Sequence, residues 1–519
     1  MTVKCLIKPS EYHDSVSLML VARDLAGLPG VEDAAVVMGT EANKALLREA
    51  GLLTNEMGSA SPNDLIIAVK AKAIEAQNAL AEAEKLLLKK ASTAPDSEFR
   101  ARSLRGAVKN QPEANLTVIS VPGRYAAAEA RQALQMGLHV LLFSDNVTLE
   151  DEIALKQKAI QEGLLLMGPG AGTAILNGVA LGFANVLPPG PVGIVAAAGT
   201  GLQEVSCLLA KYGIGITQGI GTGGRDLKAE VGGLMMLAGL RALQDDPSTQ
   251  VIALVSKPPA ESVTRQVLEQ VAESPKPTVI CFLGGDPGLS AQIPNAQPAG
   301  TLQECAWLAA LAAGANLPDL DAMLADEAKT SQTMADGLRA QLKPEQRYLR
   351  GLYSGGTLCY EAQVIWQEML AEPVYSNAPL HEQDQLPDST RSQGHSAIDL
   401  GEEEFTVGRP HPMIDNSLRI RRLLQEARDP QTAVILLDIV LGYGAHPDPA
   451  SELAPAISQA RQAAGQESRE LVFIASVTGT AGDPQGYDRQ VQVLKDAGVV
   501  ICESNAAAAR LAGKIVSGK

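Results

Sequence analysis

Four glycine-rich turns each follow an apolar run typical of a strand and precede a predicted helix. Glycine there lets backbone N–H groups approach a ligand closely, and the helix start adds a partial positive charge. Thr and Ser add hydroxyl donors, so such turns suit phosphate. A glycine can equally do no more than turn the chain, but parallel loops favour at least one phosphate site. The turns are Gly199-Thr200-Gly201, Gly221–Arg225, Ser354-Gly355-Gly356-Thr357 and Thr478-Gly479-Thr480.

We take two of these turns as the predicted phosphate site, with backbone donors at Gly199, Thr200, Gly201, Gly355, Gly356 and Thr357. None of the turns is a Walker loop, because the pattern GxxxxGK[ST] does not occur. The dinucleotide pattern GxGxxG with a ribose-binding acid is not met convincingly either. The sequence therefore predicts an anion site of another kind.

Three charged or titratable residues are candidate catalytic groups. Arg225 could clamp an anion with two hydrogen bonds. Lys257 follows the apolar run VIALVS, where a parallel sheet binds ligands, and could neutralise an anionic substrate or be an exposed turn lysine. His411 lies between two prolines in VGRPHPMID, which can present a ligand-binding imidazole or simply form a rigid turn.

The elements that must position these residues alternate between strands and helices. Residues 1–90 have a β-α-β and then a β-α order, which predicts a ferredoxin-like or ACT-like α+β domain. From residue 116 onward, continuous aliphatic runs alternate with helical patterns, as in parallel sheets buried on both faces. The segments after residues 190 and 348 share one plan of strand, glycine turn, helix and apolar strand. We therefore predict an α/β protein with a repeated flavodoxin-like domain.

Composition excludes several classes of protein. The 519 residues carry a net charge of −16, which argues against a nucleic-acid surface. The longest apolar runs have the length of strands, so no membrane partner is expected. The start MTVKCLIKPSEYHDS lacks the features of a secretion signal, and six cysteines show no CxxC pair. We expect a reduced, cytoplasmic chain without a metal site.

Several stretches resemble succinyl-CoA synthetase. VPGRY, LLLMGPGAGT, GPVGIVAAAGTGLQEV and GIGITQGIGTGGRD, within residues 115–305, are similar to its α subunit. GLYSGGTLCYEA, AIDLGEEEF and AVILLDIVLGYG, within 347–510, are similar to the C-terminal ligase domain of its β subunit. Together with YHDSVSLM, MGTEANKALL, KPPAES and GRPHPMID, they identify nearly the whole chain as similar to the FdrA family.

The resemblance implies four domains. They are an N-terminal ferredoxin/ACT-like domain (1–92), a partial Rossmann-like domain of the CoA-binding type (111–188), and two flavodoxin-like ligase domains (189–325 and 345–519).

The sequence also departs from the synthetases. Their phosphoryl group passes through a histidine, whereas this chain has no histidine between His139 and His381. Ser256-Lys257-Pro258 occupies the loop where the acid that orients that histidine is expected. An ATP-grasp segment is missing, and only the second half of the CoA site is matched, by residues 121–125 and 143–146. We expect no permanently bound cofactor, and weak or absent CoA binding.

The FdrA family includes a component of a bacterial oxamate carbamoyltransferase of purine breakdown, in which phosphate cleaves a ureido-acid to an amide and carbamoyl phosphate. The resemblance therefore implies a carbamoyl or acyl transferase subunit that uses phosphate or carbamoyl phosphate, works with other subunits and forms a homo-oligomer. One alternative is an acyl-CoA ligase subunit whose ATP chemistry lies in a partner. Another is a metabolite-binding assembly or regulatory protein.

Overall fold

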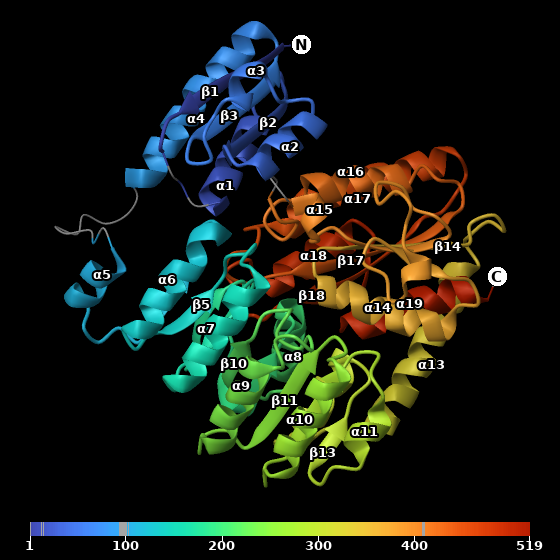
Figure 1. Ribbon diagram of the computed structural model, residues 1–519. Helices are drawn as coiled ribbons and strands as arrows, with labels where there is room; N and C mark the ends of the chain where they lie inside the picture. Colours follow the sequence, from blue (N-terminus) through green and yellow to red (C-terminus); the bar gives the residue numbers. More distant parts are fainter. Residues whose placement is uncertain are drawn as a thin grey trace. The chain divides into compact units, whose positions relative to one another are not determined.

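The computed structural model describes residues 2–11, 13, 15–92, 101, 103–406 and 410–518 (Figure 1). The chain divides into two compact units. Unit 1 comprises residues 1–113 and 402–415, and unit 2 comprises residues 114–401 and 416–519. The segment 402–415 thus interrupts the predicted domain 345–519.

Unit 1 is built on a three-stranded antiparallel sheet with the order β1-β3-β2. Alternate residues of the central strand are buried on opposite faces. Leu65 and Ile67 pack with α1 and α4, whereas Ile66 packs with Leu47 of α2 and Met57 of α3. The predicted β-α-β and β-α order is confirmed. The elements are β1 (Thr2–Lys8), α1 (Ser15–Ala26), β2 (Val31–Met38), α2 (Glu41–Glu49), α3 (Asn55–Gly58), β3 (Leu65–Ala71), α4 (Ala73–Ser92), α5 (Leu104–Asn110) and α15 (Glu403–Thr406).

Unit 2 begins with a small parallel sheet of order β4-β5-β6. This is the predicted Rossmann-like part of the chain, and its strands are short. Its elements are β4 (Leu116–Ile119), α6 (Gly123–Gln135), β5 (His139–Leu142), α7 (Leu149–Gln161) and β6 (Leu166–Met167).

The second sheet of unit 2 has the order β13-β12-β11-β9-β10-β7-β8. Strands β9 to β13 are parallel, and the hairpin β7–β8 adds an antiparallel edge. Its elements are β7 (Thr173–Leu176), β8 (Val179–Gly182), β9 (Pro189–Ala196), α8 (Gly199–Lys211), β10 (Ile216–Gly221), α9 (Leu234–Asp245), β11 (Val251–Ser256), α10 (Glu261–Ala272), β12 (Thr278–Phe282), α11 (Pro287–Ala291), β13 (Ala296–Pro298) and α12 (Leu302–Ala312).

The third sheet is parallel and has the order β15-β16-β14-β17-β18-β19. Helix α13 (Leu320–Arg339) precedes its first strand. The elements are β14 (Tyr348–Tyr353), α14 (Gly356–Met369), β15 (Val374–Ser376), η1 (Glu382–Asp384), β16 (His395–Asp399), α16 (Ser417–Glu426), β17 (Thr432–Val440), α17 (Pro449–Gln466), β18 (Val472–Thr478), α18 (Tyr487–Asp496), β19 (Val500–Cys502) and α19 (Asn505–Ser517).

The two large sheets share one winding pattern. The first strand lies in the interior of each sheet, in the runs β10-β9-β11-β12 and β16-β14-β17-β18, and the third sheet carries β15 as an additional edge strand beyond β16. This is the flavodoxin-type order, which places a ligand crevice at the carboxyl end beside the first strand. The predicted α/β fold with a repeated flavodoxin-like domain is therefore confirmed. The crevice predicted by this topology lies at β9/β11 in one repeat and at β14/β17 in the other.

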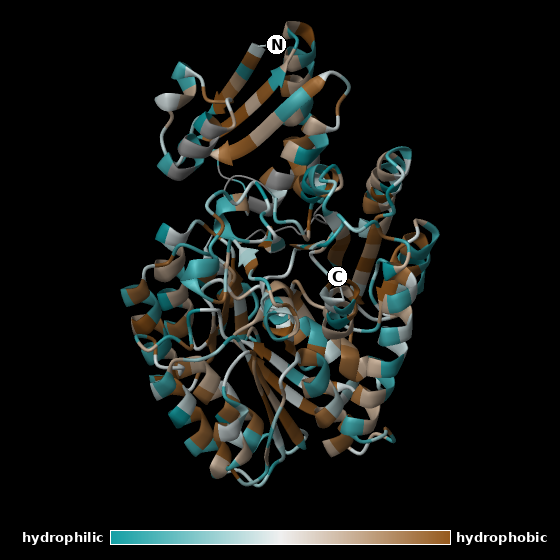
Figure 2. Ribbon diagram, turned by 90° about the vertical axis from the view of Figure 1, so that its right-hand side faces the viewer, coloured by the Kyte–Doolittle hydropathy of each residue, from teal (hydrophilic) through white to brown (hydrophobic). Residues whose placement is uncertain are grey.

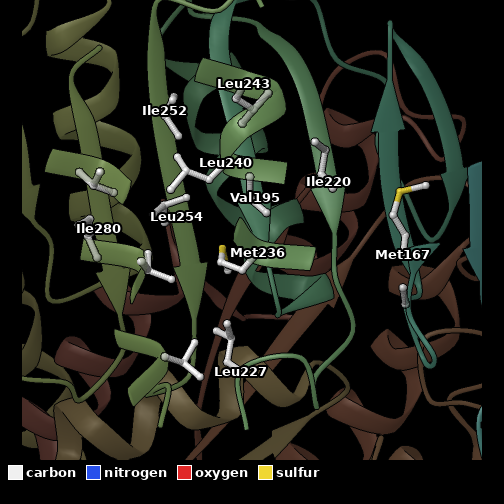
Figure 3. Packing of buried hydrophobic residues seen from close by; sticks show 14 of the residues in the cluster. Met167, Val195, Ile220, Leu227, Met236, Leu240, Leu243, Ile252, Leu254 and Ile280 are labelled. Carbon is white, nitrogen blue, oxygen red and sulfur yellow. The ribbon is translucent and has the colours of Figure 1, made fainter. Parts of the chain in front are cut away.

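Aliphatic packing holds these layers together. Side chains of α9, such as Met236 and Leu240, pack on Val195, Ile220 and Ile252 of the second sheet (Figure 3). Figure 2 shows that the interior strands carry mostly hydrophobic residues. All of Thr432–Val440 in β17 is buried, which explains the unbroken aliphatic run in the sequence.

A buried ionic cluster joins the small sheet to the second one. The Lys156 ammonium on α7 donates to Glu152 and to Asp226, each at 2.8 Å, and all three side chains are fully buried. Asp226 also accepts the N–H groups of Met235 and Met236 at the start of α9. This cluster therefore fixes α7 against the loop between β10 and α9.

Candidate functional site

Helix α8 begins directly after β9 without a side-chain cap. Its N-cap residue is Ala198, whose side chain cannot accept a hydrogen bond. The first N–H groups of a helix have no acceptor within the helix, and here they belong to Gly199, Thr200 and Gly201. Gly199 and Thr200 are partly exposed. Of the three predicted donor residues on α8, Gly199 and Thr200 are therefore open to an anion, whereas Gly201 is buried.

Helix α14 begins in the same way after β14, but a carboxylate already lies at its start. Asp438 on β17 accepts the N–H of Ser354 at 2.8 Å and that of Gly355 at 2.7 Å. The Arg419 guanidinium compensates Asp438 at 2.6 Å. The prediction that the Gly355 amide binds phosphate is therefore wrong, because Asp438 takes that donor. Gly356 and Thr357 remain as the predicted donors on this helix.

The two helix starts lie in direct contact. A Cβ atom added at Gly355 would lie 2.9 Å from both Oγ1 and Cγ2 of Thr200, and one added at Gly201 would lie 3.0 Å from Cγ2 of Thr357. Only glycine permits this approach. The structure therefore brings together the two turns from which the sequence predicts a phosphate site.

The environment of the two starts is not equivalent. A Cβ atom at Gly356 would lie 2.5 Å from a carboxylate oxygen of Asp399, which is buried at the end of β16. Helix α14 thus starts close to two buried carboxylates, Asp399 and Asp438. The start of α8 has no side-chain cap. An incoming anion is therefore favoured more strongly at α8 than at α14.

Two buried glutamates tie the repeats together reciprocally. Glu204 follows Thr200 by four residues and accepts the N–H of Asn505, the first residue of α19 in the second repeat. Glu361 follows Thr357 by four residues and accepts the N–H of Leu302, the first residue of α12 in the first repeat, at 2.6 Å. Helices α8 and α14 therefore each provide a glutamate acceptor for the first N–H group of a helix in the other repeat.

Asn505 also bonds the second glutamate. Its amide Nδ2 donates to Glu361 at 2.7 Å and to the carbonyl of Leu358 at 2.9 Å. One residue thus contacts Glu204 through its backbone and Glu361 through its side chain. This arrangement is not among the sequence predictions. Its signal in the sequence is the glutamate at the same spacing in GTGLQE and GTLCYE.

Burial raises the pKa of Glu361 from 4.5 to about 7. Because the folded state holds this proton more tightly than the unfolded state, the contribution of Glu361 to stability falls as pH rises from about 4.5 to 7. We expect Glu361→Gln to flatten that fall, since glutamine does not titrate and still offers an oxygen to Leu302. Urea unfolding at pH 5 and pH 8 measures the difference.

Glu368→Gln is the matched control for Glu361→Gln, because Glu368 is exposed on the same helix. This variant should keep the wild-type pH dependence of the free energy of unfolding. An unchanged slope in Glu361→Gln would contradict the assignment of the raised pKa to Glu361.

Lys257 lies next to α14. It is exposed at the end of β11, and its ammonium is 5.2 Å from the ring centroid of Tyr360, in the second turn of α14. Ser256 beside it is buried, and its hydroxyl has no hydrogen-bond partner among the described residues. The first repeat thus places an ammonium beside the first turns of the second repeat's site helix.

Arg225 does not form the predicted anion clamp. Its guanidinium donates to the carbonyl of Val147 at 2.8 Å and pairs with Glu152 at 2.9 Å. These contacts make Arg225 part of the buried cluster around Lys156. The glycine turn that precedes Arg225 bonds to other parts of the protein. The carbonyl oxygen of Thr222 accepts from the N–H of Gly168 and from the Lys156 ammonium.

His411 belongs to unit 1, whereas the two helix starts belong to unit 2. Its Nδ1 accepts the N–H of Met413 at 3.2 Å. Burial lowers the pKa of His411 to about 4, so the imidazole is neutral at pH 7. Arg409, its neighbour in the predicted loop, lies outside the described residues.

The Rossmann-like part has a sheet of three strands, with β4 at its outer edge. No strand pairs with the outer edge of β4 among the described residues, so the first glycine-rich β-α unit of such a site is missing from this sheet. At the start of α6, a Cβ atom on Gly123 would lie 2.2 Å from the carbonyl oxygen of Asp145. This glycine therefore serves internal packing rather than an open ligand cradle.

The described residues contain no group of three or more His, Cys, Asp or Glu residues that could hold a metal ion. No helix in this part of the chain is long and apolar enough to cross a membrane. The six cysteines are free thiols.

Two family models match the chain. Residues 352–515 match the family described as CoA-ligase, and residues 1–102 match the one described as AllF, heavy metal-associated domain.

One relative matches the chain over nearly its whole length, and others match about a third of it. The uncharacterized protein YahF of Escherichia coli (strain K12) is 45% identical over 518 residues, which cover 99% of either chain. The α subunit 2 of the ADP-forming succinate–CoA ligase of Archaeoglobus fulgidus is 30% identical over 30% of this chain and 54% of its own length. The subunit SauD of the ADP-forming sulfoacetate-CoA ligase of Bilophila wadsworthia is 25% identical over 35% of this chain and 63% of its own length.

Among solved structures, this chain is similar to ATP citrate lyase from Methanothrix soehngenii in complex with citrate and coenzyme A. The match covers 42% of this chain and 39% of the lyase chain. Its identity is 22% and its TM-score is 0.31, which is too low to establish a shared fold. The full-length match with YahF and the two family models decide the assignment. The chain belongs to the FdrA-like family that includes YahF, and its residues 352–515 match the CoA-ligase family model.

Proposed function

We propose that this chain is the phosphate-binding subunit of a multi-component carbamoyl or acyl transferase of the oxamate carbamoyltransferase type. The observation that carries the proposal is the contact between two glycine-rich helix starts, of which α8 has no side-chain cap. The absence of a histidine between His139 and His381 removes the residue that would relay a phosphoryl group. Direct attack by phosphate needs no such relay.

The proposed reaction balances without a redox partner. An oxygen of hydrogen phosphate attacks the carbamoyl carbon of oxalurate, and the bond from that carbon to the amide nitrogen breaks. The proton of the phosphate ends on the departing nitrogen, so that oxamate and carbamoyl phosphate form. The tetrahedral intermediate carries negative charge, which preorganised N–H donors stabilise.

The roles of the residues follow from their contacts. The N–H groups of Gly199, Thr200 and Gly201 hold the phosphate, and the Lys257 ammonium offsets its charge. The N–H groups of Gly356 and Thr357 face the developing oxyanion on the carbamoyl carbon. Loss of one such donor typically costs about 10²- to 10³-fold in rate.

The remaining predictions are part of the same proposal. His411 binds the second substrate through a neutral imidazole, since with a pKa of about 4 it holds no extra proton to donate at pH 7. Other subunits and self-association complete the active complex, which acts in purine breakdown without a permanently bound cofactor.

Carbamoyl phosphate formation from oxalurate and phosphate tests the proposal, with candidate partner subunits added. Turnover that requires this chain is the expected result. Absence of turnover together with CoA-thioester formation would overturn the proposal in favour of an acyl-CoA ligase subunit. The partial matches to the succinate–CoA and sulfoacetate-CoA ligase subunits favour that second candidate. Calorimetry with CoA separates the two, because the incomplete Rossmann-like part predicts weak or no binding.

A charge introduced at α8 tests the site itself. Thr200→Asp is expected to raise the KM for phosphate about tenfold or more, because a carboxylate at the helix start repels the incoming anion. Steady-state kinetics over a range of phosphate concentrations measures this. Thr148→Asp is the control, since it makes the same change at the N-cap of α7, where aspartate caps as well as threonine. Unchanged kinetics in Thr200→Asp would indicate an assembly or regulatory protein.

A further inference from the structure

Helix α4 carries an apolar row on the side opposite its buried face. The buried face packs on β1 and β3 of unit 1 and includes Ala76, Ala79 and Ala83 (Figure 1). On the opposite side, Ile74 and Leu88 are 74% and 69% exposed, more than any other large hydrophobic side chain among the described residues. Single exposed apolar side chains are common, whereas a row of them on one face marks an interaction surface.

The spacing of the row suits contact with a second helix. Ile74, Ala81 and Leu88 follow one another at intervals of seven residues, which returns them to one side of the helix after every two turns. Ala81 is exposed too, and its small side chain lets a second helix approach closely. At 1.5 Å per residue the three residues span about 21 Å, which is a line of contact rather than a pocket. We call them the α4 seam.

The charges beside the α4 seam identify the partner. Glu84 and Lys85 flank the seam, and their side chains are 48% and 72% exposed although they pair with Lys8 and Glu82 of the same chain. The two charges cancel, whereas the whole chain carries −16. The seam therefore offers no net attraction to an acidic or a basic partner. It complements a copy of itself, because each copy supplies both an ammonium and a carboxylate.

We propose that two copies of this chain associate through the α4 seam, each seam packed on the other. In parallel packing, the spacing places the Lys85 ammonium opposite Glu84 of the second copy. In antiparallel packing, it places the ammonium opposite the Asn78 amide. Two like charges lie opposite each other in neither direction. The seam belongs to unit 1, so this association does not depend on the proposed transferase activity of the helix starts in unit 2.

Sedimentation velocity of the full-length protein tests the association. A single helix seam buries less than the roughly 1,200 Å² of a standard stable interface, so the dimer should be weak and reversible. We expect a dissociation constant of about 10–100 µM, with the dimer fraction rising over protein concentrations of about 2–200 µM. A monomer throughout this range would overturn the proposal.

A double variant locates the contact within the chain. Ile74→Lys combined with Leu88→Lys should weaken the dimer at least tenfold, because lysines then face each other across the seam. Both positions are exposed and lysine is a good helix former, so the fold is kept. The change also reduces the net negative charge, so repulsion between whole chains cannot explain the loss. Ile160→Lys is the control, since Ile160 is 43% exposed on α7 of unit 2. An unchanged dissociation constant in the double variant would place the contact elsewhere and overturn the assignment.

Opposite charges should restore the association. A second double variant, Ile74→Glu combined with Leu88→Glu, should be as monomeric alone as the lysine variant. Mixed in equal amounts, the two variants should form a heterodimer, because lysine then faces glutamate whether the helices pack parallel or antiparallel. A mixture that stays monomeric would show that the two seams do not face each other, and would also overturn the proposal.

Discussion

Gly355→Ala is expected to reduce transferase turnover on the order of 100-fold and to destabilise the fold by about 1–3 kcal/mol. The backbone of Gly355 has φ −105° and ψ 111°, which alanine adopts without strain. The effect therefore arises from the added Cβ, which would lie within 3.0 Å of three atoms of Thr200. To make room, the start of α8 must move away from α14. Turnover assays and urea unfolding measure the two effects.

A second change can restore the space. Thr200→Gly removes the three atoms nearest to the new Cβ, so the double variant Gly355→Ala, Thr200→Gly should regain stability relative to Gly355→Ala. Gly465→Ala is the control, because that glycine lies in α17 with no atom within 4 Å of an added Cβ. It should be neutral or slightly stabilising. If Gly355→Ala behaves like Gly465→Ala, the contact between the two helix starts does not matter.

Lys156→Met is expected to lower the free energy of unfolding by about 3–5 kcal/mol. Methionine nearly matches the volume of lysine but removes the charge that compensates Glu152 and Asp226. All three side chains are fully buried, so the carboxylates cannot be rehydrated without unfolding part of the structure. Chemical denaturation monitored by circular dichroism gives the free energy.

Arg131→Ala provides the comparison for Lys156→Met. Arg131 pairs with Asp151 at 3.1 Å, but the two side chains are 45% and 39% exposed. Such an exposed pair contributes at most about 1 kcal/mol. Similar losses of stability in the two variants would show that the buried cluster is not held by its charges.

Local patterns sufficed to predict most of the fold. The run LLLMGPG contains the short strand β6. The run AVILLDIV is buried along its whole length in β17, because helices cover both faces of a parallel sheet. The turns at Gly199 and Gly356 are predicted as helix starts because glycine and threonine directly follow an aliphatic strand there, and the structure begins α8 and α14 at these residues.

The partners of the site residues could not be predicted, because they are distant in the sequence. Asp438 takes the Gly355 amide across 83 positions, and nothing near the turn indicates it. Arg225 pairs with Glu152, and the residues around Arg225 in GTGGRD do not indicate this partner. His411 belongs to a segment that groups with unit 1 although it follows β16 of unit 2. Each of these outcomes depends on tertiary contacts rather than on propensity.

The bonds made by Asn505, Glu204 and Glu361 have a consequence for unfolding. Helix α12 obtains an acceptor from the second repeat, and helix α19 obtains one from the first. If either repeat unfolded alone, the other repeat would lose a buried hydrogen bond, and a glutamate carboxylate would remain buried without that partner. The two repeats must therefore lose their structure together as one cooperative block, even though each has a complete sheet of its own.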